Sequence, residues 1–485
     1  MSSADTAEFL IEPRWLLPVA PGNTVLEWQA VAVSGGRIAA IGPAAELRER
    51  NPTRTRIVRE RHALLPGLVN AHTCACHTLL RGLPVRAPRL RWLTETLAPL
   101  ERRVLSADLV RDGTRLGVAE MLRAGITCYA DQSPVPEEAA RAAAAAQVRA
   151  LIGLPISDAA TVWAEDATAH LARAEALWDE YRSDARIGLY FAPQPARGAS
   201  DATLARLRRV ADELDARIVM HLGELPDTGT LEPHRPGVAD GVAPRHAWGV
   251  RPLARLQALG LLRPGFSAVG ALSCHEEDAQ LLARHGAALI ACPQAELRLH
   301  RGMPLLPGSR PGALATDTPA AAGALDMLAE VRSAALLYGM TAQEALQLAT
   351  LGGAAALGLA TEIGSIEPGK SADLTCLELD VPGCQPLTDV PAAIVFGATR
   401  AQVTDVWSAG RAALSAGRLL AFDEAELAAL AAQWTQRLAL EAAARARSRP
   451  PSRRAATPTA RSSRSSMRWR RASGTVTGNS VRCTC

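Results

Sequence analysis

The chain has 485 residues, 48% hydrophobic and 21% charged, enough for one large barrel-type domain and a smaller one. No apolar run reaches the roughly 18 residues that span a bilayer, and the acidic N-terminus lacks a signal-peptide pattern. The nine scattered cysteines favour a reducing compartment. We therefore expect a cytoplasmic protein without membrane partners. The formal net charge of +4 splits into +11 from arginines after residue 444 and −7 from residues 1–444, so the folded body is not expected to bind nucleic acid.

The sequences at both ends of the folded body have patterns typical of β-strands. Residues 8–65 contain short apolar runs with Gly and Pro between them, and Ser34-Gly35-Gly36 between two such runs predicts a hairpin. Residues 364–412 return to the same pattern. We therefore predict one composite β-sandwich domain made from residues 1–65 and 363–421.

Residues 66–362 alternate short apolar runs with longer helical patterns. Strands are predicted at Ile126–Tyr129, Ala150–Leu154, Ile187–Ala192, Arg217–Leu222, Phe266–Leu272 and Ala287–Ala291, and helices at Ser106–Ala124, Pro136–Gln147, Asp201–Leu214, Pro252–Leu259 and Glu276–His285. This alternation predicts an α/β fold with a parallel sheet, best matched by a (β/α)8 TIM-like barrel. A doubly wound sheet is the alternative, but the Gly-rich phosphate loop typical of it is absent.

Two segments follow the predicted domains. Residues 422–445 are rich in Ala and Leu in a helical pattern, and residues 446–485 are rich in Arg, Ser, Pro and Thr, a composition typical of disorder. We interpret this tail as a sequence without a selected fold, produced by translation past the natural end of the protein. A tail that binds nucleic acid is the alternative.

The first cluster of chemically active side chains is His72-Thr73-Cys74-Ala75-Cys76-His77, directly after an apolar run. On a strand, His72, Cys74 and Cys76 would share one face, and imidazole and thiolate both suit zinc. A turn with two buried cysteines is the plain alternative. A separate structural zinc site of Cys74, Cys76 and His77 is another, although the second ligand pair typical of such sites is missing.

Polar side chains follow three further predicted strands. They are His221 and Glu224 in an HxxE pattern, the segment Gly270–His275, and Asp317. Taken singly, a solvated His and Glu and a helix N-cap Asp would explain two of the three. A barrel, however, brings its strand ends into one ring, so His72, Cys74, His221 and Asp317 are predicted metal ligands, with Glu224 beside them for proton transfer.

Longer motifs make the chain similar to a known family. The matching segments are Pro66-Gly67-Leu68-Val69-Asn70-Ala71-His72-Thr73, Leu79-Leu80-Arg81-Gly82, His221-Leu222-Gly223-Glu224, Cys292-Pro293-Gln294, Thr316-Asp317, Leu325-Asp326-Met327 and Gly364-Ser365-Ile366-Glu367-Pro368-Gly369-Lys370-Ser371-Ala372-Asp373-Leu374. Over roughly residues 8–440 the chain resembles the amidohydrolase superfamily, in its cytosine deaminase/chlorohydrolase-like branch. It resembles most the 5′-methylthioadenosine/S-adenosylhomocysteine deaminases.

The resemblance implies hydrolysis of a carbon–nitrogen bond. The expected reaction is deamination of a purine-like or triazine-like heterocyclic amine by metal-activated water. One divalent metal is implied, zinc with iron as the alternative, with His72, His221 and Asp317 as ligands by match and Cys74 at the position of a further family ligand. Glu224 is the implied catalytic proton carrier, and Trp92, Glu95 and Gln194 are implied substrate-binding residues. A homo-oligomer is also implied.

Several positions depart from the family pattern. Cys74 replaces the second His of the first motif, Gly270 stands where a His is expected on strand six, and Gln194 replaces a substrate-facing His. Ala295 and Glu296 replace a Ser-Asn pair. Losing one such group costs about 10²–10⁴ in rate, so a catalytically impaired or inactive pseudoenzyme of the same fold is the alternative.

Overall fold

The structure is a computed structural model that describes residues 7–22, 24–51, 55–85, 87, 89–193, 199–222, 252–270, 276–299 and 310–448. The chain divides into two units, residues 1–438 and 439–485. The first unit contains a parallel barrel sheet and a mixed sheet. Of the second unit, the described residues are the C-terminal end of helix α16 (Glu424–Ser448). No helix among the described residues is long and apolar enough to cross a membrane.

Eight strands form the barrel sheet and neighbour one another in chain order. They are β6 (Leu68–Thr73), β7 (Ile126–Asp131), β8 (Arg149–Ile156), β9 (Ile187–Pro193), β10 (Ile218–His221), β11 (Phe266–Val269), β12 (Ala288–Ala291) and β13 (Ala313–Leu314). Every pairing between them is parallel, and a parallel bridge between Thr73 and Asp317 joins the last strand to the first. The predicted barrel is therefore confirmed.

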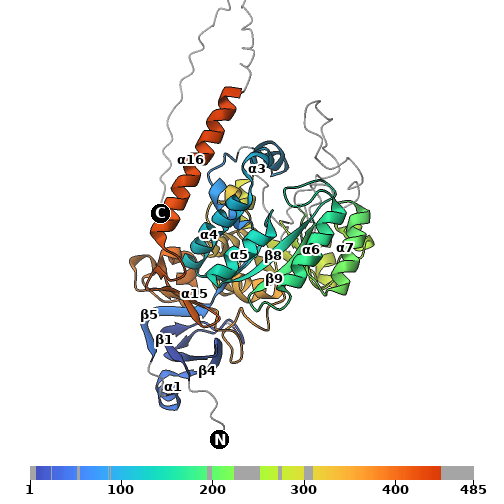
Figure 1. Ribbon diagram of the computed structural model, residues 1–485. Helices are drawn as coiled ribbons and strands as arrows, with labels where there is room; N and C mark the ends of the chain where they lie inside the picture. The colour runs from blue at the N-terminus through green and yellow to red at the C-terminus, as the bar shows by residue number, and fades with distance from the viewer. Residues whose placement is uncertain are drawn as a thin grey trace, which may run out of the picture. The chain divides into compact units, whose positions relative to one another are not determined.

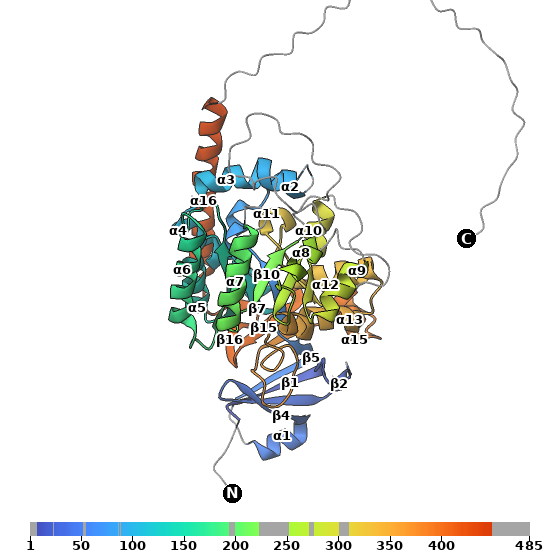
Figure 2. The same cartoon turned by 90° about the vertical axis from the view of Figure 1, so that its right-hand side faces the viewer.

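Helices follow the strands and cover the barrel (Figures 1 and 2). They include α4 (Ala107–Arg123), α5 (Pro136–Ala146), α6 (Ala167–Tyr181), α7 (Asp201–Glu213), α8 (Pro252–Ala258), α9 (Glu276–Arg284), α10 (Pro293–Arg298), α12 (Met327–Tyr338) and α13 (Ala342–Gln347). Strands β6 and β7 are buried along their whole length, because helices and neighbouring strands cover both faces. This burial explains why their sequences read as continuous apolar runs.

The mixed sheet combines both ends of the first unit. Its order is β17-β16-β15-β14-β5-β1-β3-β4, with β2 (Leu26–Glu27) paired to β1. The strands are β1 (Phe9–Leu16), β3 (Gln29–Ser34), β4 (Arg37–Pro43), β5 (Arg56–Pro66), β14 (Leu374–Glu378), β15 (Val403–Ser408), β16 (Arg411–Ser415) and β17 (Arg418–Leu419). Strands β5 and β14 pair antiparallel, so the blue N-terminal and orange C-terminal strands share one layer in Figure 1. The predicted composite β-structure from both chain ends is confirmed.

The predicted hairpin is β3–β4. Ser34 pairs with Arg37, and Gly35 and Gly36 form a two-residue turn with φ of 56° and 73°. Both angles lie in the left-handed region, which glycine adopts without steric cost and which fits the twist of a hairpin.

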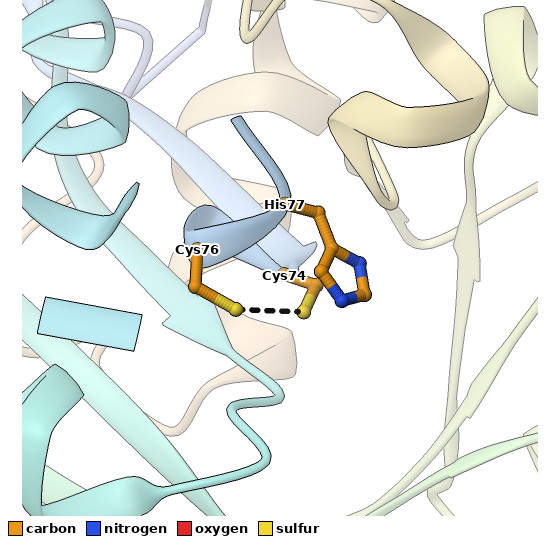
Figure 3. A group of neighbouring side chains, drawn as sticks. All are labelled: Cys74, Cys76 and His77. Carbon is orange, nitrogen blue, oxygen red and sulfur yellow. Dashed lines mark hydrogen bonds between the residues drawn. The ribbon is translucent and has the colours of Figure 1, made fainter. Parts of the chain in front are cut away.

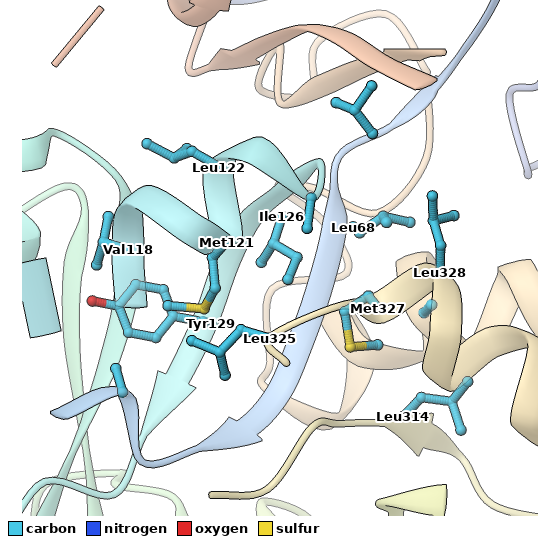
Figure 4. Close-up of a cluster of buried hydrophobic side chains, with 14 of the residues drawn as sticks. Leu68, Val118, Met121, Leu122, Ile126, Tyr129, Leu314, Leu325, Met327 and Leu328 are labelled. Carbon is cyan, nitrogen blue, oxygen red and sulfur yellow. The ribbon is translucent and has the colours of Figure 1, made fainter. Parts of the chain in front are cut away.

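A large apolar cluster fixes the first barrel strands against helices α4 and α12. Met121 and Leu122 of α4, Leu68 of β6 and Met327 and Leu328 of α12 are buried side by side (Figure 4). Burying one such side chain contributes about 1.5–3 kcal/mol, so this packing holds the strand that carries His72 in a fixed place.

Candidate metal centre

Strand β6 reaches the site through a close approach at Gly67. A Cβ at this residue would lie 2.0 Å from Oγ1 and 2.4 Å from Cγ2 of Thr127. Since Cβ atoms do not come this close to other heavy atoms, only glycine lets the chain pass from β5 into β6 here.

The first and last barrel strands are joined by side-chain hydrogen bonds just below the site. Asn70 Nδ2 donates to Thr316 Oγ1 at 2.8 Å, and the Thr316 backbone N–H donates to Asn70 Oδ1 at 3.0 Å. One residue further, the Asp317 backbone N–H donates to the carbonyl of His72 at 3.1 Å. Both side chains of this Asn–Thr pair are fully buried. The pair therefore sets the register in which His72 and Asp317 meet.

Three predicted ligands converge at the carboxyl ends of β6, β10 and β13. His72 Nε2 and His221 Nε2 are 2.7 Å apart, with their rings at 82°, and His221 Nε2 is 3.9 Å from Asp317 Oδ1. The ligand atoms of His72, His221 and Asp317 all lie within 4.8 Å of one another. Their exposed fractions are 2%, 8% and 2%, so the group is shielded from bulk water. The predicted meeting of these residues is what the structure shows.

The donor set fits a divalent ion. Two imidazoles and a carboxylate are nitrogen and oxygen donors that zinc accepts. At 2.7 Å one imidazole donates a hydrogen bond to the other, whereas two nitrogens bound to one tetrahedral zinc at about 2.0–2.1 Å would be about 3.3 Å apart. A bound ion therefore requires the two rings to separate by about half an ångström.

Gly270 lies against this group. A Cβ built on it would be 3.8 Å from His221 Nδ1, and its φ is +63°. Its backbone N–H donates to the carbonyl of Ile290 at 3.1 Å. The position where the family pattern expects a His thus borders His221 and offers no side chain.

Cys74 groups with Cys76 and His77. The expected alternation of His72, Cys74 and Cys76 on one face is wrong, because β6 ends at Thr73 and Ala75–Leu80 forms a 3-10 helix, η1. The turn brings Cys74 Sγ to 3.7 Å from Cys76 Sγ, and these two sulfurs group with His77 (Figure 3). The assignment of Cys74 to the metal of His72 stays a prediction.

Two buried acidic residues near this turn were not among the predicted site residues. Asp131, at the end of β7, accepts the backbone N–H of Ala75 at 2.8 Å, and burial raises its pKa to about 7. Glu101 Oε1 lies 3.0 Å from Nε2 of His77. Burial alone would lower the pKa of His77, but Cys74 and Glu101 raise it to about 10. Asp131 could have been noticed, because it closes an apolar run as Asp317 does.

The remaining predicted site residues are not brought to the three ligands by any contact of the described residues. Trp92 is 1% exposed and its indole N–H donates to the carbonyl of Pro84 at 3.2 Å. Glu95 is paired with Arg91 at 3.0 Å and its side chain is 60% exposed. Gln194, Glu224 and His275 lie outside the described residues. The roles of Trp92, Glu95, Gln194 and Glu224 stay predictions.

The barrel with its ligands at the strand ends defines a class of metal-dependent hydrolase. The Amidohydrolase family matches residues 63–413, and a bacterial imidazolonepropionase-like composite domain matches residues 30–53. The chain therefore belongs to the Amidohydrolase family, and the resemblance drawn from the motifs is confirmed.

Relatives match over almost their whole length. The 5-methylthioadenosine/S-adenosylhomocysteine deaminases of Teredinibacter turnerae and Saccharophagus degradans are 34% and 31% identical, over 90% of this chain and 99% and 97% of theirs. An adenosine deaminase from Xanthomonas campestris with bound zinc superposes with a TM-score of 0.82 at 38% identity, over 90% of this chain and 99% of that one. A zinc-bound atrazine chlorohydrolase from Arthrobacter aurescens, 20% identical with a TM-score of 0.77 over 88% and 99% of the two chains, shares the fold.

Proposed function

We propose that this protein is a zinc-dependent deaminase of a purine-like heterocycle, of the adenosine or methylthioadenosine kind. The observation that carries the proposal is the convergence of His72, His221 and Asp317 at one buried point, from three strands far apart in the chain. The relatives that are 31–38% identical are named as deaminases of methylthioadenosine and S-adenosylhomocysteine or of adenosine, which supports a purine-like substrate. A triazine ring is the second candidate, supported by the shared fold of the atrazine chlorohydrolase.

The roles of the residues follow from their chemistry. When bound, a divalent ion would acidify a water molecule and supply the nucleophile. His72 and His221 would hold it through their facing Nε2 atoms, and Asp317 would balance part of its charge. The low exposure of all three keeps bulk water from screening these charges.

Proton transfer is assigned to Glu224. Hydrolysis needs a carboxylate that takes a proton from water and delivers it to the ring nitrogen and the leaving amine. Glu224 follows His221 by three residues in the HxxE segment, which supports this role. Zinc is proposed over iron because zinc is bound in the related adenosine deaminase. None of the six cysteines among the described residues is in a disulfide, which supports a cytoplasmic location, and a homo-oligomer is proposed on the family resemblance.

The test is ammonia release by the zinc-loaded full-length chain. Methylthioadenosine, adenosine, 8-oxoguanine and ammeline analogues are offered separately, and ammonia is measured by a coupled assay. We expect release from a purine nucleoside and a loss of at least about 10³-fold in Asp317→Asn. The matched control is Asp326→Asn, an acid in the same segment that caps helix α12. No ammonia from any substrate, with zinc bound, would establish the inactive alternative.

A further inference from the structure

A second group of metal-binding side chains lies immediately after His72. Cys74, Cys76 and His77 stand at the turn between β6 and η1, and one ligand atom from each lies within 4.8 Å of the others (Figure 3). Their exposed fractions are 8%, 0% and 4%, so the sulfur atoms are enclosed by protein.

The two sulfur atoms form a thiol–thiol hydrogen bond at a spacing that two ligands of one ion could also have. They are 3.7 Å apart. A disulfide would place them at about 2.05 Å. Two thiolates on a tetrahedral zinc, with Zn–S bonds of about 2.3 Å, are separated by about 3.75 Å. The observed separation matches this tetrahedral edge.

His77 is oriented to supply the third ligand. Its Nδ1 is 2.8 Å from Thr318 Oγ1, which can accept the Nδ1–H, so that an ion displacing the Nε2 proton would bind the Nε2 lone pair. Figure 3 shows the ring beside the sulfur of Cys74. The carboxylate of Glu101, from helix α3 (Ala98–Val104), lies 3.0 Å from Nε2 and is 6% exposed, so an oxygen donor stands on the same side of the ring.

The turn that carries these residues is fixed on both sides. The His77 backbone N–H donates to the carbonyl of Cys74 at 3.0 Å, and Asp131 accepts the N–H of Ala75. Helix α4 approaches so closely that a Cβ on Gly113 would lie 2.2 Å from the Cys76 carbonyl. A rigid turn of this kind presents its side chains in one arrangement before an ion binds.

We propose that Cys74, Cys76 and His77 form a zinc site separate from the ion of His72, His221 and Asp317, with the Glu101 carboxylate beside Nε2 of His77. Two thiolates and an imidazole with little solvent access are typical of a structural site rather than a catalytic one. The proposal gives Cys74 to this second ion. It predicts two zinc ions per chain, one with sulfur ligands and one without.

Cobalt substitution of the full-length chain tests the proposal, because thiolate–cobalt bonds give a charge-transfer absorption that nitrogen and oxygen ligands do not. We expect this band in the wild type, its loss of more than about 80% in Cys76→Ser, and its retention in Cys128→Ser, which changes a buried thiol of β7. His72→Ala should lose one cobalt per chain and keep the band. Band retention in Cys76→Ser combined with loss in His72→Ala would overturn the proposal, since Cys74 would then bind the first ion.

A measurement on the wild type avoids any doubt about folding of the variants. X-ray absorption at the zinc edge of the two-zinc protein should show sulfur scatterers at about 2.3 Å, on average one per zinc. Absence of sulfur from this shell would overturn the proposal. The outcome is independent of catalysis, because a chain without ammonia release can still hold the sulfur-bound zinc.

Discussion

The Nε2 atoms of His72 and His221 lie 2.7 Å apart although 149 residues separate them in the chain. Each ring comes from the carboxyl end of its own barrel strand, β6 or β10, and Asp317 arrives from a third strand end. Two buried imidazoles and a carboxylate at this spacing can hold one divalent ion.

Removing one of these rings should remove one metal ion. His221→Ala takes away one of three ligands, and we expect the metal content of the purified chain to fall by one ion relative to wild type. The content is measured by plasma mass spectrometry after dialysis. His285→Ala, which changes a histidine at the end of α9, should leave it unchanged. An unchanged content in His221→Ala would mean that these residues do not share an ion.

Adding an imidazole at Gly270 should increase activity. A side chain here begins 3.8 Å from His221 Nδ1, close enough to act on a water at the site. The positive φ opposes the change by about 1–2 kcal/mol, while a restored proton-transfer group is worth about 10²-fold or more. We expect kcat of Gly270→His to exceed wild type by at least about tenfold. Gly270→Ala carries the same backbone strain without the ring and should show no gain, so equal rates in the two variants would refute the role of the imidazole.

Gly67 should tolerate no side chain. In Gly67→Ala the new methyl group would lie 2.0 Å from Thr127 Oγ1, and the expected loss of unfolding free energy is about 3 kcal/mol, because the barrel core cannot yield without moving β7. Urea unfolding followed by circular dichroism measures it. Gly312→Ala, where a Cβ finds its nearest neighbour at 3.7 Å, should change stability by less than about 0.5 kcal/mol. The double variant Gly67→Ala/Thr127→Ala should recover part of the loss; no recovery would place the strain elsewhere.

Glu12 should make stability depend on pH. Burial alone would raise its pKa, but hydrogen bonds and charge from Arg56 and Arg48 hold it at about 2, below the ordinary 4.5. A depressed carboxyl pKa stabilises the folded state above pH 4.5 and loses this effect as the pH falls toward 2. We expect Glu12→Gln to lower the unfolding free energy by about 2 kcal/mol at neutral pH and by much less at about pH 3.

The matched control for Glu12 is Glu46→Gln. Glu46 pairs with Arg50 at 3.5 Å on the surface, where both side chains are more than half exposed, so its removal should change stability by less than about 0.5 kcal/mol. A difference between wild type and Glu12→Gln that stays constant from neutral pH to pH 3 would contradict the ion-pair explanation.

Strands and ligands that depend on local pattern could be predicted from the sequence. Apolar runs predicted β7, β8 and β9 within two residues at each end, and polar residues at the ends of such runs predicted His72, His221 and Asp317. Helix α6 was not predicted, although Asp166 caps it by accepting the backbone N–H of Ala169. The buried residues Leu171, Ala174 and Leu177 also recur at helical spacing, so both the cap and the apolar stripe of this helix are present in the sequence.

The side chains after Thr73 could not be predicted from strand periodicity. Their arrangement depends on η1, and that turn is set by contacts with residues distant in sequence: Asp131 on the N–H of Ala75 and Gly113 against the carbonyl of Cys76. Period-two alternation assumes that the strand continues, and no residue between His72 and His77 is a strong strand breaker. The position of the Cys74 side chain therefore depends on tertiary contacts and not on the local sequence pattern.

The pairing of β5 with β14 has a consequence for synthesis on the ribosome. Pro66 pairs with Leu374, so roughly 300 residues must be made before strand β5 meets its partner. At about 5–20 residues per second this takes about 15–60 s, during which the nascent chain exposes an open, apolar strand edge. Chaperone engagement during this interval, and degradation of chains that stop before Leu374, would then govern how much protein a cell obtains.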